Sequence, residues 1–162
     1  MTFTLDDLTH PQVLALLQEH LQEMHASSPP EAVHALDVSQ LKQPDIHFYS
    51  LWLQGEQGEP VLAACGALKR LDGCLGELKS MRSSKACRGL GYGRAMLNFL
   101  IQQAHDAGLS ALYLETGTAA YFDAARALYA SAGFRSCGPF GDYPEHELSC
   151  FMKLSLHQNI SA

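Results

Sequence analysis

Two arginines flank three glycines at every second position in a short basic segment near the middle of the chain, and this segment is suited to binding an anion. It reads Arg88-Gly89-Leu90-Gly91-Tyr92-Gly93-Arg94. Glycine lacks a Cβ, so a glycine-rich backbone can approach an anion closely and can adopt positive φ. Arginine supplies a full positive charge and a planar fork of donors that suits phosphate oxygens. The segment, called the 88–94 turn below, therefore predicts a phosphate site.

A strand and a helix must position this turn. The sequence predicts a strand over Glu77–Ser83 and an amphipathic helix from Ala95 onward. The apolar stripe of this helix consists of Leu97, Leu100, Ile101 and Ala104. A helix start offers unpaired N–H groups and the positive end of the helix dipole to a phosphate. We therefore expect backbone N–H groups of the turn to bind the anion.

Two common phosphate motifs do not fit the turn. A P-loop ends in Gly-Lys-Ser/Thr, but here Gly93 is followed by Arg94 and Ala95. A dinucleotide fingerprint has the spacing G-x-G-x-x-G, but Gly89, Gly91 and Gly93 are separated by two positions throughout. Both classes of phosphate site are therefore disfavoured.

Length and composition are those of an ordinary globular protein. The 162 residues suit a single domain spanning 1–162, with 47% hydrophobic and 17% charged residues. The formal net charge of −6 disfavours nucleic acid as a partner and suits a cationic substrate. The N-terminus has no signal-peptide pattern, and no apolar run approaches the roughly 20 residues of a membrane span. We therefore expect a cytoplasmic protein with no membrane partner, and the sequence leaves a homodimer open.

The cysteines and histidines form no recognisable reactive pattern. Five scattered cysteines without a C-x-x-C motif are expected to be reduced apolar fillers. Cys87 adjoins the turn but has no matched histidine partner, so a nucleophilic role is disfavoured. The eight histidines are dispersed, and we expect no metal.

The remaining elements predict an α+β fold. Helices are predicted at His10–Ala26, Val38–Gln43 and Tyr121–Ala132, and further strands at Phe3–Leu5, Asp45–Gln54, Val61–Leu71, Ala111–Glu115, Phe134–Cys137 and Leu148–Leu156. Short turns between the early strands indicate an antiparallel meander. The strand Ala111–Glu115 follows the central helix, so it should run parallel to Glu77–Ser83 through a right-handed crossover. We expect a mixed, mostly antiparallel sheet of six or seven strands with helices on its faces.

Four local patterns, in this order of elements, resemble the GNAT superfamily, the GCN5-related N-acetyltransferases. They are Arg88-x-x-Gly91-x-Gly93, Leu114-Glu115-Thr116-Gly117, the segment Ala127–Phe134 (similar to A-x-x-L-Y-x-x-x-G-F) and the loop Gly138–Tyr143, which is similar to that of small bacterial members. The resemblance spans nearly the whole chain. It implies the acyl-CoA N-acyltransferase fold, in which the two parallel central strands splay to open a cleft.

The resemblance also implies acetyl-CoA as donor, a primary amine as acceptor, direct transfer and no metal. By position, the turn would bind the CoA pyrophosphate, while Met81 and Ser83 would hydrogen-bond the pantetheine arm as an added strand does. The Met81 N–H would also stabilise the oxyanion. The implied cofactor-binding residues are Met81, Ser83, Arg88, Gly89, Leu90, Gly91, Tyr92, Gly93, Arg94, Phe122 and Tyr129. Phe122 departs from the family, whose members often carry Asn there, so either its ring packs on the arm or that contact is lost.

Transfer to an amine needs a base and an acid. The amine, with an ordinary pKa of roughly 10.4, must lose a proton, and the leaving thiolate, with a thiol pKa of roughly 8.5, benefits from gaining one. Glu77 is the base candidate, since its offset from Arg88 resembles that of the catalytic glutamate in histone-modifying members. Regular alternation would also place Glu77 and Met81 on one face of the strand. Glu115 is the substitute base and water a third option, while Tyr129 is the acid candidate.

Each of these residues also has a purely structural interpretation. Glu77 could pair with a lysine or face solvent, and Tyr129 could be a core tyrosine with its hydroxyl bonded to backbone. The acceptor site should be walled by the loop Ser28–Asp37 and by the loop Phe140–Tyr143. Its candidate residues are Glu115, Phe140, Asp142 and Tyr143, with Asp37 and Asp142 available to attract a cationic amine.

Three functions remain open. The sequence favours an acetyl-CoA-dependent N-acetyltransferase that acts on a small amine such as an amino acid or a polyamine. A CoA-binding sensor without turnover is the second possibility. A protein or peptide N-acetyltransferase is the third, and the absence of a docking domain disfavours it.

Overall fold

A computed structural model describes residues 1–156. Seven strands form one sheet in the order β1-β2-β3-β4-β5-β7-β6. The strands are β1 (Thr2–Leu5), β2 (Ile46–Gln54), β3 (Pro60–Arg70), β4 (Leu75–Ser83), β5 (Ala111–Gly117), β6 (Arg135–Cys137) and β7 (Ser149–Ser155). Every neighbouring pair is antiparallel except β4 and β5. The mixed sheet and its one parallel pair confirm the predicted fold class.

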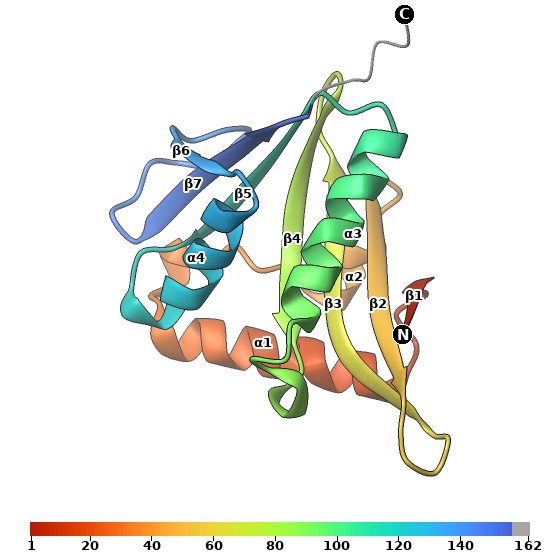
Figure 1. The fold of residues 1–162 in the computed structure, drawn as a ribbon. Coiled ribbons are helices and arrows are strands. Elements are labelled where there is room, and N and C mark those ends of the chain that lie inside the picture. Colours follow the sequence, from red (N-terminus) through yellow and green to blue (C-terminus); the bar gives the residue numbers. More distant parts are fainter. Residues whose placement is uncertain (157–162) are drawn as a thin grey trace, which may run out of the picture.

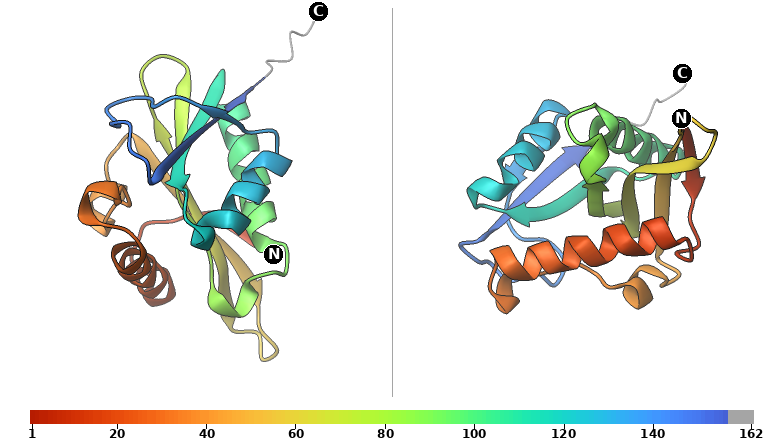
Figure 2. Two further views of the ribbon diagram at one scale, coloured as in Figure 1. Left: turned by 90° about the vertical axis from the view of Figure 1, so that its left-hand side faces the viewer. Right: turned by 90° about the horizontal axis from the view of Figure 1, so that it is seen from below.

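Helices cover both faces of the sheet. The helices are α1 (Pro11–Ser27), α2 (Val38–Leu41), α3 (Tyr92–Asp106) and α4 (Asp123–Ser131), with 3₁₀ turns η1 (Pro30–Ala32), η2 (Lys85–Cys87) and η3 (Ala120–Phe122). Figures 1 and 2 show α3 and α4 on one face and α1 and α2 on the other. None of the helices in residues 1–156 combines the length and hydrophobicity that a bilayer span requires.

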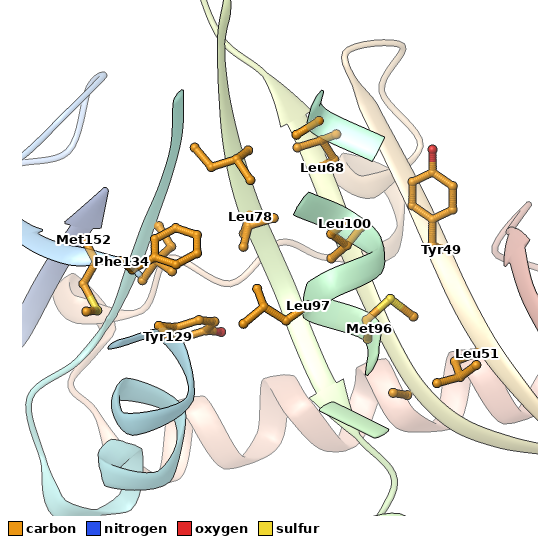
Figure 3. Packing of buried hydrophobic residues seen from close by; sticks show 14 of the residues in the cluster. Tyr49, Leu51, Leu68, Leu78, Met96, Leu97, Leu100, Tyr129, Phe134 and Met152 are labelled. Atoms are coloured by element: carbon orange, nitrogen blue, oxygen red, sulfur yellow. The ribbon is translucent and has the colours of Figure 1, made fainter. Parts of the chain in front are cut away.

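The hydrophobic core has two parts, one on each side of the sheet. The larger cluster lies beneath α3 and α4 and includes Leu97, Leu100 and Tyr129, all of them buried (Figure 3). The smaller cluster joins α1 and α2 to β2 and β3, with Val13 and Phe48 buried in it. The sheet is therefore held from both faces, and its central strands are fixed relative to α1 and α3.

The predicted elements all occur, with two shifted starts. The central helix begins at Tyr92 rather than Ala95, so Gly93 and Arg94 lie in its first turn. The helix predicted over Tyr121–Ala132 is divided into η3 and the helix α4, which begins at Asp123. The other predicted bounds lie within two residues of the observed ones.

The parallel pairing between β4 and β5 is short, and this opens the sheet. Only three pairs join the two strands, and the last of them is Glu77 with Tyr113. Beyond it, β4 continues to Ser83 and β5 to Gly117 without pairing with each other, and the two strands diverge (Figure 1). The splay expected from the family resemblance is confirmed.

A bulge in β4 corrects one sequence expectation. Between the pairs Ala67–Lys79 and Cys65–Arg82, β4 advances by three positions while β3 advances by two, and Ser80 has a positive φ of 54°. The bulge changes the face of the sheet to which the side chains after it point. Met81 packs with the cluster beneath α3, as Leu78 does, whereas the Glu77 side chain lies on the opposite face. Glu77 and Met81 therefore do not share a face, contrary to the expectation from regular alternation.

Candidate active site

A cleft of about 620 Å³ lies where β4 and β5 part. Several predicted site residues line it, namely Met81, Ser83, Arg88, Gly89, Gly91, Gly93, Arg94, Glu115, Phe122 and Tyr129. The lining does not include Glu77, Leu90, Tyr92, Phe140, Asp142 or Tyr143. The structure therefore brings most of the predicted cofactor residues, and one of the two candidate bases, to a single cavity.

The 88–94 turn has the geometry of an anion site. Gly89 and Gly91 have φ of 75° and 89°, which L side chains rarely adopt, and a Cβ at either would meet no protein atom within 4 Å. The first intrahelical bond of α3 runs from Ala95 N to Gly91 O at 3.0 Å. The N–H groups before Ala95 thus have no partner within the helix, as at any helix start. The backbone here is open to a ligand and supplies donors.

The two arginines of the turn have protein partners. The Arg88 guanidinium is 3.5 Å from the Glu19 carboxylate of α1, and its side chain is 44% exposed. The Arg94 guanidinium donates to Ser131 Oγ at 2.7 Å. Gly93 lies close to β4, because a Cβ there would be 3.2 Å from Ser83 Oγ. The residues present therefore fit a diphosphate, with Arg88 exposed enough to reorient toward it.

Tyr129 and Phe122 line the cleft from the α4 side. Burial raises the pKa of Tyr129 to about 12, so its hydroxyl stays protonated near neutral pH. The hydroxyl is directed from α4 toward β4 (Figure 3). Phe122 packs against Gly117 so closely that a Cβ on Gly117 would be 2.2 Å from its ring. Both aromatic side chains are held by packing, and the roles predicted for them stay predictions.

Glu77 is part of a buried group beneath the cleft. It is 2% exposed, its Oε1 is 3.0 Å from Lys79 Nζ, and it accepts a hydrogen bond from the Tyr143 hydroxyl. Lys79 Nζ also donates to Tyr143 Oη at 2.6 Å. Burial, and next the charge of Glu77, raise the pKa of Tyr143. The lysine pairing that the sequence left open for Glu77 is present.

Glu115 has the properties expected of a base. Its carboxyl lines the cleft, and burial raises its pKa from the ordinary 4.5 to about 7. Ser149 and Lys79 lower this pKa, and the negative charge of Glu77 raises it further. A carboxyl with a pKa near neutrality can both accept and release a proton at physiological pH.

The raised pKa of Glu115 predicts a pH-dependent loss of stability. The unfolded chain releases this proton near pH 4.5 and the folded chain near 7, so the wild type loses stability as pH rises between these values. Glu115→Gln cannot ionise, and one pKa unit corresponds to about 1.4 kcal/mol. In urea unfolding, the free energy of unfolding of the variant minus that of wild type should be about 2 kcal/mol larger at pH 8 than at pH 5. An equal difference at both pH values would contradict the assignment.

The opposite wall of the cleft comes from α1 and the loop after it. His20, Met24 and the segment 32–35 line it, so the wall predicted for the loop Ser28–Asp37 is present. Asp37 does not line the cleft and instead caps α2, where its side chain accepts from the Gln40 N–H, so its role at the acceptor site stays a prediction. None of the residues in the loop Phe140–Tyr143 lines the cleft either, so the acceptor role predicted for Phe140, Asp142 and Tyr143 also stays a prediction.

Phe140 and Tyr143 have a structural place instead. The Phe140 ring contacts the Tyr113 ring in a tilted arrangement at a centroid distance of 4.8 Å and the Phe151 ring edge-on at 5.8 Å. Tyr143 contacts Phe151 at 5.7 Å and bonds Glu77 and Lys79. These aromatic rings support the buried group beneath the cleft.

The charged residues of the α1 side were missed by sequence reasoning. Arg82 lines the cleft and pairs with Glu19 at 2.9 Å and Glu23 at 2.6 Å. Tyr121 accepts a hydrogen bond from Arg82 and donates one to Glu23, which joins η3 to α1. Burial, together with the charge of Arg82, lowers the pKa of His20 to about 4. The spacing of Glu19 and Glu23, four apart on one helix face, was the available signal.

Comparisons with known proteins agree with this geometry. A family model described as the acetyltransferase (GNAT) family matches residues 12–134. A Bacillus subtilis (strain 168) protein, named as the uncharacterized N-acetyltransferase YsnE, is 46% identical over 156 residues, which are 96% of this chain and 100% of the relative. The IAA acetyltransferase of Azospirillum brasilense is 37% identical, covering 90% of this chain and 89% of that protein.

A solved structure shares the fold. It is the crystal structure of a Klebsiella pneumoniae subsp. pneumoniae protein assigned as an acyl-CoA N-acyltransferase. The two chains superpose with a TM-score of 0.75 at 28% identity, covering 96% of this chain and 97% of the other. The similarity in sequence and fold thus extends over nearly the whole chain.

Proposed function

Because this chain belongs to the acetyltransferase (GNAT) family and is an acetyl-CoA-dependent acyltransferase, we propose that its acceptor is the primary amine of a small molecule. The family resemblance seen in the sequence is thereby confirmed, while the acceptor is the step beyond it. Acetyl-CoA supplies an activated acetyl group as a thioester. The chain's own residues bind this co-substrate, orient it and move the protons.

The 88–94 turn and the start of α3 are the proposed diphosphate site. Gly89 and Gly91 leave space that a Cβ would take, and the N–H groups at the start of α3 are free of helical partners. The positive end of the helix dipole adds to the attraction. The pantetheine arm then lies in the gap beside β4, where Met81 and Ser83 line the cleft.

Glu115 is the proposed base and Tyr129 the proposed acid. Glu115 first takes one proton from the bound ammonium, directly or through water, which frees the nitrogen lone pair for attack. As the new N–C bond then forms and the C–S bond breaks, the nitrogen loses a second proton to solvent. The thiolate takes the proton of the Tyr129 hydroxyl. Glu115 replaces Glu77 in this role because Glu77 is buried, is held by Lys79 and Tyr143, and does not line the cleft.

One observation carries this proposal. Glu115 on β5 and Tyr129 on α4 line the same cleft as the 88–94 turn, at the place where β4 and β5 separate. A candidate base, a candidate acid and a candidate anion site thus open onto one cavity, and acetyl transfer from CoA to an amine can use this combination.

Thiol release with a panel of primary amines tests the proposal. We expect at least one small amine to release thiol from acetyl-CoA, with kcat rising with pH to a plateau above an apparent pKa of about 7. Glu115→Gln should lower kcat by about 100-fold and remove this rise, because it removes the base. Glu77→Gln is the matched control and should retain the rise.

Two results would contradict the proposal. If no amine in the panel released thiol although the protein still bound acetyl-CoA, a small-amine acceptor would be contradicted. A Glu77→Gln variant that loses the pH-dependent rise while Glu115→Gln keeps it would return the base to Glu77.

The name of one relative suggests a second candidate for the acceptor. The Azospirillum brasilense protein, 37% identical to this chain, is named an IAA acetyltransferase. The panel therefore includes IAA as a separate arm. Thiol release with IAA but with no amine would favour this second candidate.

A further inference from the structure

Two opposite charges lie on either side of the gap between β4 and β5. Glu77 and Tyr113 form the last pair of the two strands, so Lys79 and Glu115 occupy the positions two further along each strand. Both line the cleft, and the charge of Lys79 acts on Glu115. Within residues 1–156, Glu115 has no basic side chain within the 4.0 Å limit of an ion pair. The cleft where the two strands part is therefore lined by a lysine from β4 and by a glutamate from β5.

Lys79 is held in place by two hydrogen bonds, and a third N–H of its ammonium remains without a partner among the described residues. Its ammonium has three N–H donors. One is directed to Glu77 Oε1 at 3.0 Å and one to Tyr143 Oη at 2.6 Å. Its side chain is only 8% exposed, so it has little freedom to move away. The third donor is available to a group in the cleft.

Neighbouring polar atoms also lack partners. His34 Nε2, Ser80 Oγ and Arg82 Nε are buried and, among the described residues, have no hydrogen-bond partner, and all three residues line the cleft. Burial, and next the charge of Lys79, lower the pKa of His34, so its neutral ring can donate one N–H. Buried polar atoms without partners are uncommon in folded proteins. A ligand that accepts these hydrogen bonds would satisfy them.

We propose that the acceptor is an amine that also carries a carboxylate next to the amine, as in an amino acid. Its ammonium lies toward Glu115 and its carboxylate is bound by Lys79 and His34. The inference rests on the proposed amine acetylation and narrows its substrate class. Glu77 then has a positioning role, because with Tyr143 it holds Lys79.

Other amines fit these charges less well. A simple amine would leave the third donor of Lys79 and the His34 N–H without an acceptor. A polyamine would bring further positive charge toward Lys79 and Arg82. The cleft wall also includes apolar side chains, among them Met24, Val33 and Leu148, which suit an amino acid with an apolar side chain.

Matched pairs of acceptors test the inference. The probes are L-leucine with 3-methylbutylamine, L-phenylalanine with 2-phenylethylamine, and L-methionine with 3-(methylthio)propylamine, assayed by thiol release. We expect wild-type kcat/KM for at least one amino acid to exceed that of its matched amine by about ten-fold or more, since a charged hydrogen bond is lost in the amine. Turnover of the amines with the amino acids inert would overturn the inference and leave the proposed function standing. No turnover in either set would overturn both.

Variants locate the carboxylate site. Lys79→Met should raise KM for the amino acid by about 30-fold. The kcat for the amino acid and the KM for the matched amine should change by less than about three-fold. Since this variant leaves Glu77 buried and unpaired, the double variant Glu77→Gln/Lys79→Met is made in parallel, and His34→Ala should act in the same direction. Lys42→Met, an exposed lysine outside the cleft, is the control and should change nothing. Equal losses for the amino acid and its matched amine would overturn the assignment to Lys79.

Discussion

Gly91→Asp should abolish acetyl-CoA binding, with an affinity loss of about 100-fold or more in calorimetry. Gly91 is the N-cap of α3 with φ of 89°, and its Cβ would point into space that the protein leaves empty. An aspartate there places a negative charge against the diphosphate. Its carboxylate can also accept from the free N–H groups of the first turn and thereby occupy the donors. Charge-assisted hydrogen bonds are the strong ones, so their loss is large.

Two controls separate charge from backbone strain. Gly91→Ala keeps the positive-φ cost without the charge and should lose less affinity than the aspartate. Gly73→Asp adds the same residue at a φ of 68°, again with no protein atom within 4 Å, but in the turn between β3 and β4. It should bind acetyl-CoA as wild type does. A folded Gly91→Asp protein with unchanged affinity would contradict the assigned site.

Tyr129→Phe should lower kcat by about 100-fold while the Kd for acetyl-CoA changes less than about three-fold. General acid catalysis typically contributes 10²-fold or more, and only the hydroxyl is removed. The ring should stay in place, because it is buried and packs edge-on against Phe134 at a centroid distance of 5.9 Å. Thiol release under acceptor saturation, with calorimetry on the same variant, measures both quantities.

A buried tyrosine away from the cleft provides the control. Tyr49 belongs to the same hydrophobic cluster but does not line the cavity, so Tyr49→Phe should leave kcat unchanged. If Tyr129→Phe also turned over at the wild-type rate, Tyr129 would be a core residue and not the acid. If wild type itself bound acetyl-CoA without turnover, the sensor function would be favoured.

Local patterns in the sequence predicted the parts of the site that local physics determines. Gly89 and Gly91 predicted a backbone with positive φ. The apolar stripe of α3 predicted which face of the helix packs on the sheet. The crossover from Glu77–Ser83 to Ala111–Glu115 predicted the parallel pair, and the family resemblance predicted the splay that opens the cleft. The first two features depend on neighbours close in sequence, whereas the parallel pair follows from a general rule of chain connection.

The features that were missed depend on single irregularities or on distant contacts. The bulge at Ser80 inserts one residue that no periodic pattern reveals, and it separates Glu77 from Met81. The contact between Glu77 and Tyr143 joins positions 66 residues apart. Asp37 is different, since Asp37-Val38-Ser39-Gln40 is a capping-box pattern that could have been recognised from the sequence.

A crystal structure with bound acetyl-CoA is the most direct test of the central claim, which is that the start of α3 binds the diphosphate and directs the thioester into the gap between β4 and β5. We expect diphosphate oxygens within hydrogen-bond distance of the N–H groups at Gly91, Tyr92 and Gly93, and the acetyl group between Glu115 and Tyr129. A diphosphate bound away from the 88–94 turn, or an acetyl group outside that gap, would contradict the claim.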